Sequence, residues 1–215
     1  MSDRYPGYDV LTKRDSPSWN AITRKVVEER LRIDPNEHRF LTDAEWTTAC
    51  AICQCIIPQA PDRAQPVPLA AMLDQKLMDD VREGYRDARL PPIREAWRRA
   101  LRAFDEEATL RYSGRFHEID VARQNALLEL AQAGRTQAAA WGDMPAEVFF
   151  AKRLLHDILS AYYAHPTAWS EIGFGGPASP RGYVRLGFDR RDPWEASEAR
   201  PGREDRARRE NARVG

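Results

Sequence analysis

The sequence predicts an all-α protein: an irregular bundle of about six helices with a long glycine- and aromatic-rich C-terminal loop and extended termini. Apolar residues recur at helical spacing in about six segments, as in amphipathic helices that bury one face. Proline and glycine separate these segments, and no stretch alternates apolar and polar residues as a half-buried strand does. The 215 residues are enough for one domain with a sizeable core.

The chain is expected to have three parts. Residues 1–15 are polar and turn-rich, and form an N-terminal arm that orders only against another surface. Residues 16–188 form a single helical domain. Residues 189–215 are a charged tail whose one large apolar side chain is Trp194, so the tail is disordered or folds onto a partner.

The first two helices have recognisable starts. The first is expected from Ser16, with Pro17 at its first helical position, to about Arg32. Its predicted apolar stripe is Trp19, Ile22, Val26 and Val27. In the second helix, Thr42 and Glu45 form a capping box, Leu41 packs on Trp46 across the cap, and Pro58 stops the helix.

Four further helices follow a proline-rich connector over residues 58–68. The third is expected over about 69–83, and Pro91 and Pro92 open the fourth. Asp120 caps the fifth, which Gly134 closes, and the sixth runs from near Pro145 to about Ala164. The predicted buried face of the third helix is Leu69, Leu73, Leu77 and Val81, and that of the fourth is Ile93, Trp97, Ala100, Leu101, Phe104 and Ala108. The predicted band of the sixth helix, which we expect at the centre of the fold, is Val148, Ala151, Leu155, Ile158, Leu159 and Tyr162, flanked by Phe149, Phe150 and Leu154.

Charge and hydropathy argue against several classes of partner. Thirty-three basic side chains balance thirty-three acidic ones, so the chain has no global field to attract nucleic acid or an anionic membrane surface. No apolar run approaches the roughly 18–20 residues that span a bilayer, so no direct membrane insertion is expected. The first fifteen residues hold no apolar region behind a basic start, which favours a cytoplasmic location.

Three cysteines, Cys50, Cys53 and Cys55, lie within six residues on the second predicted helix. An odd number packed so closely is a poor disulfide framework, and Cys53 falls on the apolar stripe, so we interpret the thiols as small buried groups. The alternative is a cysteine-ligated iron–sulfur or other metal site in an electron-relay subunit.

Other catalytic chemistry is not indicated, and we predict no catalytic and no cofactor-binding residue. The four histidines are dispersed, and His156 and Asp157 point about 100° apart because they are adjacent on a helix. They are expected to lie on a solvated polar face.

The long segment after the sixth helix is the strongest candidate for a functional surface. Residues 165–188 contain five glycines and several aromatic side chains, and irregular loops of this length are usually functional. Glycines beside aromatics permit close backbone approach to another surface, and aromatic anchors are typical of interface hot spots. The predicted partner-binding residues are Trp169, Ile172, Gly173, Phe174, Gly175, Gly176, Pro177 and Tyr183.

Three passages give the chain a resemblance to the gluconate 2-dehydrogenase subunit 3 family, over about residues 39–177. Phe40–Trp46 leading to Cys53–Pro58 is similar to that family's opening helix and its Ile-Ile-Pro stop. Phe149–Pro166 resembles its long helix with an aromatic and proline turn, and Trp169–Pro177 resembles its tryptophan, Ile-Gly-Phe and glycine–proline loop.

The resemblance implies a non-catalytic small subunit that binds and stabilises a large FAD-dependent sugar or alcohol dehydrogenase of the glucose–methanol–choline type. FAD is then expected in the partner and no cofactor in this chain, and many relatives also have a cytochrome c subunit alongside. Many carry a twin-arginine export signal as well, whereas here Arg14 stands alone with no apolar region after it. The complex is therefore expected to stay cytoplasmic, or to reach the periplasm by co-export with its partner. A free-standing helical adaptor is the remaining alternative.

Overall fold

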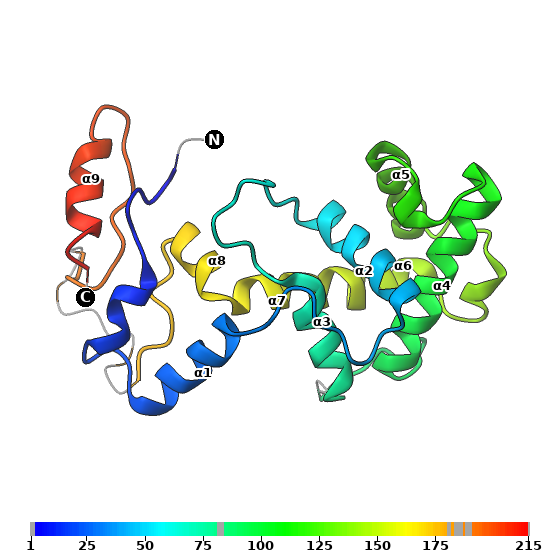
Figure 1. The fold of residues 1–215 in the computed structure, drawn as a ribbon, viewed down its shortest axis with the longest axis horizontal. Coiled ribbons are helices and arrows are strands. Elements are labelled where there is room, and N and C mark those ends of the chain that lie inside the picture. Colours follow the sequence, from blue (N-terminus) through cyan, green and yellow to red (C-terminus); the bar gives the residue numbers. More distant parts are fainter. Residues whose placement is uncertain (1–2, 81–83, 180–181, 183–186, 188–190, 215) are drawn as a thin grey trace. The chain divides into compact units, whose positions relative to one another are not determined.

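The protein is all-α in a computed structural model, which confirms the predicted fold class (Figure 1). The structure describes residues 3–80, 84–179, 182, 187 and 191–214, and these contain helices and no β-strand. Contacts divide the chain into two compact units, a grouping that differs from the expected arm, domain and tail. Unit 1 comprises residues 1–33, 65–67 and 162–215, and unit 2 comprises residues 34–64 and 68–161.

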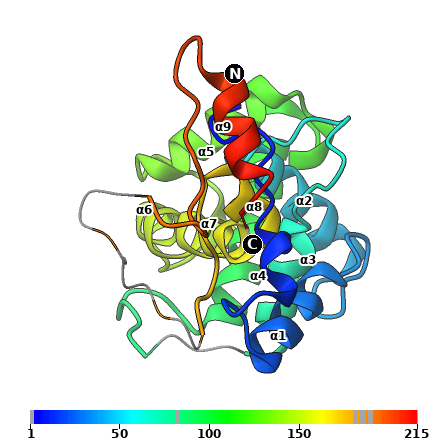
Figure 2. The same ribbon diagram turned by 90° about the vertical axis from the view of Figure 1, so that its left-hand side faces the viewer.

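Unit 1 brings the two ends of the chain together. It contains η1 (Val10–Asp15), α1 (Ala21–Leu31), α8 (Pro166–Glu171) and α9 (Glu204–Asn211). The N-terminal segment and α9 lie side by side (Figures 1 and 2). The Asn211 amide donates to the Pro6 carbonyl at 3.0 Å. The Thr12 hydroxyl likewise donates to the Val214 carbonyl at 2.6 Å. The surface that orders the N-terminal arm is thus part of the same chain.

The core of unit 1 is assembled from residues far apart in the sequence. Its buried members are Tyr8, Val10, Trp19, Val27, Trp169 and Val214. Because the segments before α1, in α8 and after α9 all contribute, none of them has a complete apolar core alone. Burial of this shared apolar surface is what orders both ends of the chain.

Helix α1 begins later than the sequence predicts. Asn20, not Ser16, is the N-cap, and its side chain accepts from the Thr23 N–H at 2.9 Å. Pro17 therefore lies outside the helix, because the asparagine side chain three residues before Thr23 caps the N–H of that residue. Two members of the predicted stripe are also exposed, Ile22 by 74% and Val26 by 40%, so the stripe is wrong at these positions.

Unit 2 contains the long helices and the aromatic core. Its main elements are α2 (Asp43–Ile56), α3 (Leu69–Met78), α4 (Ile93–Tyr112), η2 (Phe116–Glu118), α5 (Val121–Gln132), η3 (Ala139–Trp141), α6 (Ala146–Phe149), η4 (Phe150–Leu154) and the first part of α7 (Leu155–Ala164). All six predicted core residues of α4 are buried. Edge-to-face contacts join Trp97 to Phe149 and Phe104 to Trp141, at centroid distances of 5.3 and 5.4 Å.

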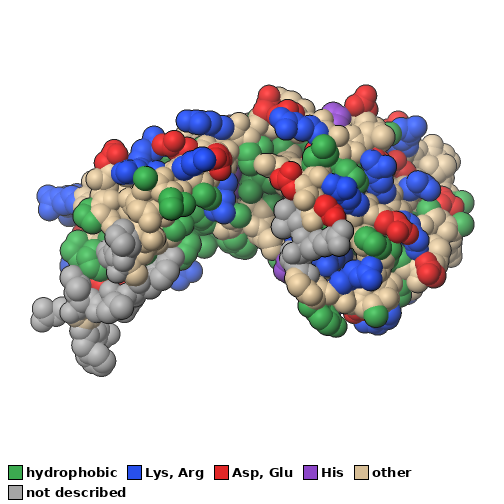
Figure 3. All heavy atoms as spheres, turned by 90° about the horizontal axis from the view of Figure 1, so that it is seen from below, with side chains coloured by type: hydrophobic (Ala, Val, Ile, Leu, Met, Phe, Trp, Pro, Cys, Tyr) green, Lys and Arg blue, Asp and Glu red, His purple; other side chains and the backbone are tan. Residues whose placement is uncertain are grey.

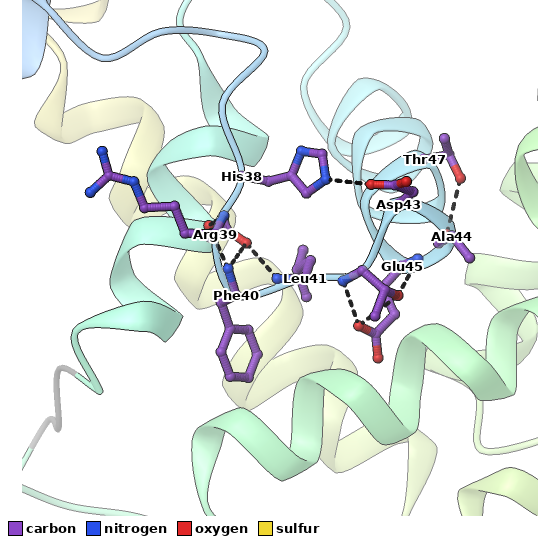
Figure 4. A network of polar contacts seen from close by, with 10 residues as sticks. His38, Arg39, Phe40, Leu41, Asp43, Ala44, Glu45 and Thr47 are labelled. Atoms are coloured by element: carbon purple, nitrogen blue, oxygen red, sulfur yellow. Dashed lines mark hydrogen bonds and ion pairs between the residues drawn. The ribbon is translucent and has the colours of Figure 1, made fainter.

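Carboxylates organise the start of α2. Thr42 and Glu45 form the predicted capping box, and His38 pairs with Asp43 at 3.0 Å (Figure 4). The Asp74 side chain, buried on α3, accepts the backbone N–H groups of residues 39, 40 and 41 at 2.7 to 3.2 Å. One carboxylate thereby satisfies three successive donors ahead of the helix.

Helix α3 ends at Met78, several residues before the predicted end. Asp80 adopts a left-handed conformation with φ 48°, and its N–H donates to the Leu77 carbonyl at 3.2 Å, which closes the helix. Leu69, Leu73 and Leu77 are buried as predicted, whereas the predicted core position Val81 lies outside the described residues.

The expected sixth helix exists as α6, η4 and α7 in succession, with a π-helical turn at η4. There the Leu155 N–H donates to the Phe150 carbonyl. Val148 and Ile158 of the predicted band are buried, as are the expected flanks Phe149, Phe150 and Leu154, while Ala151 and Leu159 of the band are exposed. The buried face also carries the charged residues Arg153 and Asp157, which a search for apolar residues at helical spacing passes over.

Charges of both signs are interspersed on the molecular face in Figure 3, as the balanced composition leads one to expect. Among the described helices, none is long and apolar enough to cross a bilayer.

Candidate partner-binding surface

The predicted partner-binding residues begin on α8. Pro166 occupies its first turn, and the His165 ring accepts the Thr167 N–H at 3.3 Å. Trp169 is 3% exposed, and its indole N–H donates to the Tyr163 carbonyl at 2.6 Å. Trp169 is therefore part of the interior of unit 1, held at both its apolar and its polar end.

The Ile-Gly-Phe motif that follows is a helix stop. Gly173 has φ 67°, the Gly173 N–H donates to the Ser170 carbonyl at 3.3 Å, and the Phe174 N–H donates to the Trp169 carbonyl at 2.9 Å. The rings of Trp169 and Phe174 meet edge to face at 5.9 Å. These are the two hydrogen bonds and the apolar contact of a Schellman motif. The spacing of tryptophan, glycine and phenylalanine therefore has a local structural cause.

The glycines permit close approach, and the segment that approaches is the chain's own N-terminal part. A Cβ on Gly173 would lie 2.5 Å from the Tyr5 ring, and one on Gly175 would lie 2.9 Å from Lys13 Nζ. The Val10 N–H donates to Ser170 Oγ at 3.1 Å, which fixes this approach. Residues 5–13 thus cover the loop face that we expected another polypeptide to contact.

The structure brings most of the predicted contact residues together but exposes only part of them. Trp169 and Gly176 are buried, and Gly173, Gly175 and Pro177 are half-buried. Ile172 and Phe174 keep 45% and 40% of their surface exposed, and Tyr163 at the end of α7 keeps 49%. Tyr183 lies outside the described residues. Binding of a partner by these residues stays a prediction, for which Ile172 and Phe174 offer the accessible apolar surface.

The three cysteines lie on α2 with their thiols shielded. Burial raises the pKa of Cys50 to about 11 and raises the pKa of Cys53 further. The Cys55 thiol donates to Gln124 Oε1 at 3.2 Å. Within the described ranges, no three His, Cys, Asp or Glu side chains are grouped so as to hold a metal ion. Cys53 is buried and Cys50 and Cys55 are half-buried, which fits the interpretation of small apolar groups.

Sequence analysis missed a buried charge cluster in unit 2. The Asp157 side chain is fully buried, where the sequence predicted a solvated face. It accepts from Lys76 Nζ at 2.8 Å and from the Trp97 indole N–H at 2.7 Å, and Arg153 lies 3.8 Å away. Asp157 lies on α7 at ordinary helical spacing from the buried Arg153 and Leu154, and an Arg-x-x-x-Asp spacing on a helix was the available signal.

A family model described as gluconate 2-dehydrogenase subunit 3 matches residues 43–176, which is more than half of the chain. The matched region runs from the first turn of α2 to Gly176 and includes the whole Schellman motif. Neither the curated proteins nor the solved structures contain a match to the chain.

Proposed function

Because the chain belongs to the gluconate 2-dehydrogenase subunit 3 family, we propose that it is a non-catalytic small subunit of an FAD-dependent dehydrogenase acting on sugars or alcohols. In this proposal it binds a large flavoprotein subunit of the glucose–methanol–choline type, stabilises it and assists its maturation. The family match over residues 43–176 is the observation that carries the proposal.

The surface of unit 1 supports a binding role. Ile172 and Phe174 expose apolar side chains at the helix stop that ends α8, and Tyr163 exposes its ring at the end of α7. A locally fixed apolar surface loses little conformational entropy on association, which favours a stable contact. The same residues lie in or beside the loop for which the sequence predicts partner binding.

The cofactor belongs to the partner in this proposal. FAD would be bound by the large subunit, and this chain would hold no cofactor of its own. A cytochrome c subunit would be a further member of the complex and would accept the electrons from the flavin.

Co-expression with a large FAD-dependent dehydrogenase of the glucose–methanol–choline type tests the proposal. An affinity-tagged chain should retain the flavoprotein through purification, and the complex should show visible flavin absorption. Flavoprotein made without this chain should be recovered in lower soluble yield. Retention of no flavoprotein, together with turnover of sugars by the isolated chain, would contradict the proposal.

Matched variants locate the contact. Ile172→Ser with Phe174→Ser should reduce flavoprotein recovery, because the double variant removes the exposed apolar surface beside the helix stop. Leu110→Ser with Val121→Ser is the control, because these side chains of unit 2 are also exposed, by 62% and 60%, but lie outside the loop. Equal losses in both variants would show that the loop has no special part in binding.

We propose that the complex assembles in the cytoplasm, with co-export to the periplasm as the alternative route. Cell fractionation with an antibody against this chain separates the two, since assembly without export leaves both subunits in the cytoplasmic fraction.

A further inference from the structure

A basic pocket lies in unit 1 between α9 and the segment that precedes it. Its volume is about 370 Å³. Its lining, hereafter the arginine pocket, consists of Arg191, Pro193, Arg206, Arg209, Glu210 and Arg213. Four guanidinium groups therefore face one carboxylate, which leaves a surplus of three positive charges in one concave site.

The carboxylate in the pocket is already engaged. Glu210 accepts from Ser197 Oγ at 2.5 Å and from Arg206 Nε at 2.9 Å, and Arg191 Nε lies 4.0 Å away. Hydrogen bonds from Ser197 and Arg206 lower the pKa of the Glu210 carboxyl, so it is ionised at neutral pH. Its negative charge is thus shared by two of the four arginines.

The other two arginines keep their charges available. Arg209 lies in the last turn of α9 and Arg213 in the turn that follows the helix, both are exposed, and within the described part of the chain neither guanidinium forms an ion pair. Guanidinium groups present forked donors that match the two oxygens of a carboxylate. The pocket therefore offers two guanidinium groups that form no ion pair with a carboxylate of the described residues.

We propose that the arginine pocket binds acidic side chains of a partner polypeptide. The inference rests on the proposed function for the existence of that partner, and it adds a charged contact to the apolar one at Ile172 and Phe174. A carboxylate pair from one short acidic segment would reach Arg209 and Arg213 together and would displace only water.

The surrounding charge favours a localised carboxylate over an extended polyanion. The described residues 191–214 carry six acidic side chains besides their seven arginines, and the whole chain has no net charge. Nucleic acid and anionic bilayers present rows of phosphates and need a broad positive field, which these acids interrupt. A short acidic segment needs only the pocket itself.

Binding of a fluorescently labelled hexaglutamate peptide to the full chain tests the proposal, measured by anisotropy at low ionic strength. Arg209→Gln with Arg213→Gln should weaken binding about tenfold or more, because two charge-assisted contacts are lost. Arg200→Gln with Arg203→Gln is the control, since it removes the same charge from exposed residues of the same segment that do not line the pocket.

The outcomes separate the pocket from general charge and from the proposed function. Equal weakening in both double variants, no measurable peptide binding, or competition by inorganic phosphate at lower concentration than by the peptide would overturn the proposal. Recovery of a co-expressed flavoprotein is measured in parallel for the same variants. Full recovery with Arg209→Gln and Arg213→Gln would also overturn the charged contact while leaving the proposed function intact.

Discussion

Gly173 has both a backbone conformation and a neighbour that exclude a side chain. Its φ of 67° is costly for any residue with a Cβ, and that Cβ would lie 2.5 Å from the Tyr5 ring. Gly173→Ala should therefore lower the free energy of unfolding by about 3 kcal/mol, from left-handed strain together with overpacking. Urea denaturation of the full chain measures the loss.

Gly202 provides the matched control for Gly173. It also has a positive φ, 73°, but nothing lies within 4 Å of its Cβ position. Gly202→Ala should therefore cost only the backbone strain, about 1 to 2 kcal/mol. Tyr5→Ala should reduce the difference between the two variants. An equal cost at both glycines would show that the contact with Tyr5 is unimportant for stability.

Asp157 is the charge on which the interior of unit 2 depends. Asp157→Asn keeps the shape of the side chain but leaves Lys76 and Arg153 without their central negative charge. We expect a loss of about 3 kcal/mol or more in the free energy of unfolding, because breaking a buried ion pair strands the remaining charge. Asp143→Asn is the control, since that carboxylate is 94% exposed and its loss should change the unfolding midpoint little.

The cysteines predict an alkaline loss of stability. Burial raises the pKa of Cys50 to about 11 from an ordinary value of 9.0, so the folded state binds more protons than the unfolded state between these values. The stabilisation that the protonated Cys50 thiol gives the folded state is fully present below the unfolded pKa and is lost as the pH rises through the folded pKa. Urea midpoints should therefore fall between about pH 8 and about pH 11 more steeply in the natural chain than in a triple Cys→Ala variant. An equal pH dependence of the urea midpoint in the two chains would contradict the shielding of the thiols from solvent.

At the scale of elements, the starts of two helices could be predicted from the sequence, whereas the buried faces of the helices could be predicted only in part. Thr42 and Asp120 were found as caps because a cap is a local pattern of a few residues. The burial of Asp157 was missed because a search for apolar residues at helical spacing passes over a charged side chain on the buried face. The exposed Ile22 and Val26 were assigned to a core for a different reason: periodicity identifies an apolar stripe but not what covers it.

Asp74 gives a prediction at the scale of elements, because it joins α3 to the turn before α2. Asp74→Asn replaces a charged acceptor of three backbone N–H groups by a neutral amide, and we expect a loss of about 2 kcal/mol. Asp79→Asn changes the same charge at the exposed end of α3 and should have little effect. Hydrogen exchange at residues 39–41 should increase in the first variant only. Unchanged exchange there would show that Asp74 does not hold the turn.

At the scale of the whole molecule, unit 1 depends on residues from both ends of the chain. Removal of residues 204–215 deletes α9 and Val214, which belongs to the buried cluster around Trp169. We expect faster hydrogen exchange at Val10 and a red-shifted tryptophan emission, because the apolar cover of Trp169 is lost.

Unit 2 is the internal control for this truncation, since none of the deleted residues belongs to it. Exchange within α4 should stay as slow as in the full chain. Retained protection at Val10 would show that α9 adds little to unit 1.

Long-range pairings in unit 1, such as Thr12 with Val214, could not be predicted from the sequence because no local pattern specifies them. The sequence indicated the loop that follows α7, but not that residues 5–13 cover it.

The pairing of Thr12 with Val214 also sets an order of events during synthesis. Unit 2 has all of its residues once position 161 has left the ribosome, and can fold while translation continues. The N-terminal tyrosines and Val10 must wait until position 214 emerges before their apolar surface is covered. Until then the nascent chain exposes the apolar side chains of Tyr8 and Val10, which are the kind of surface that a ribosome-bound chaperone binds.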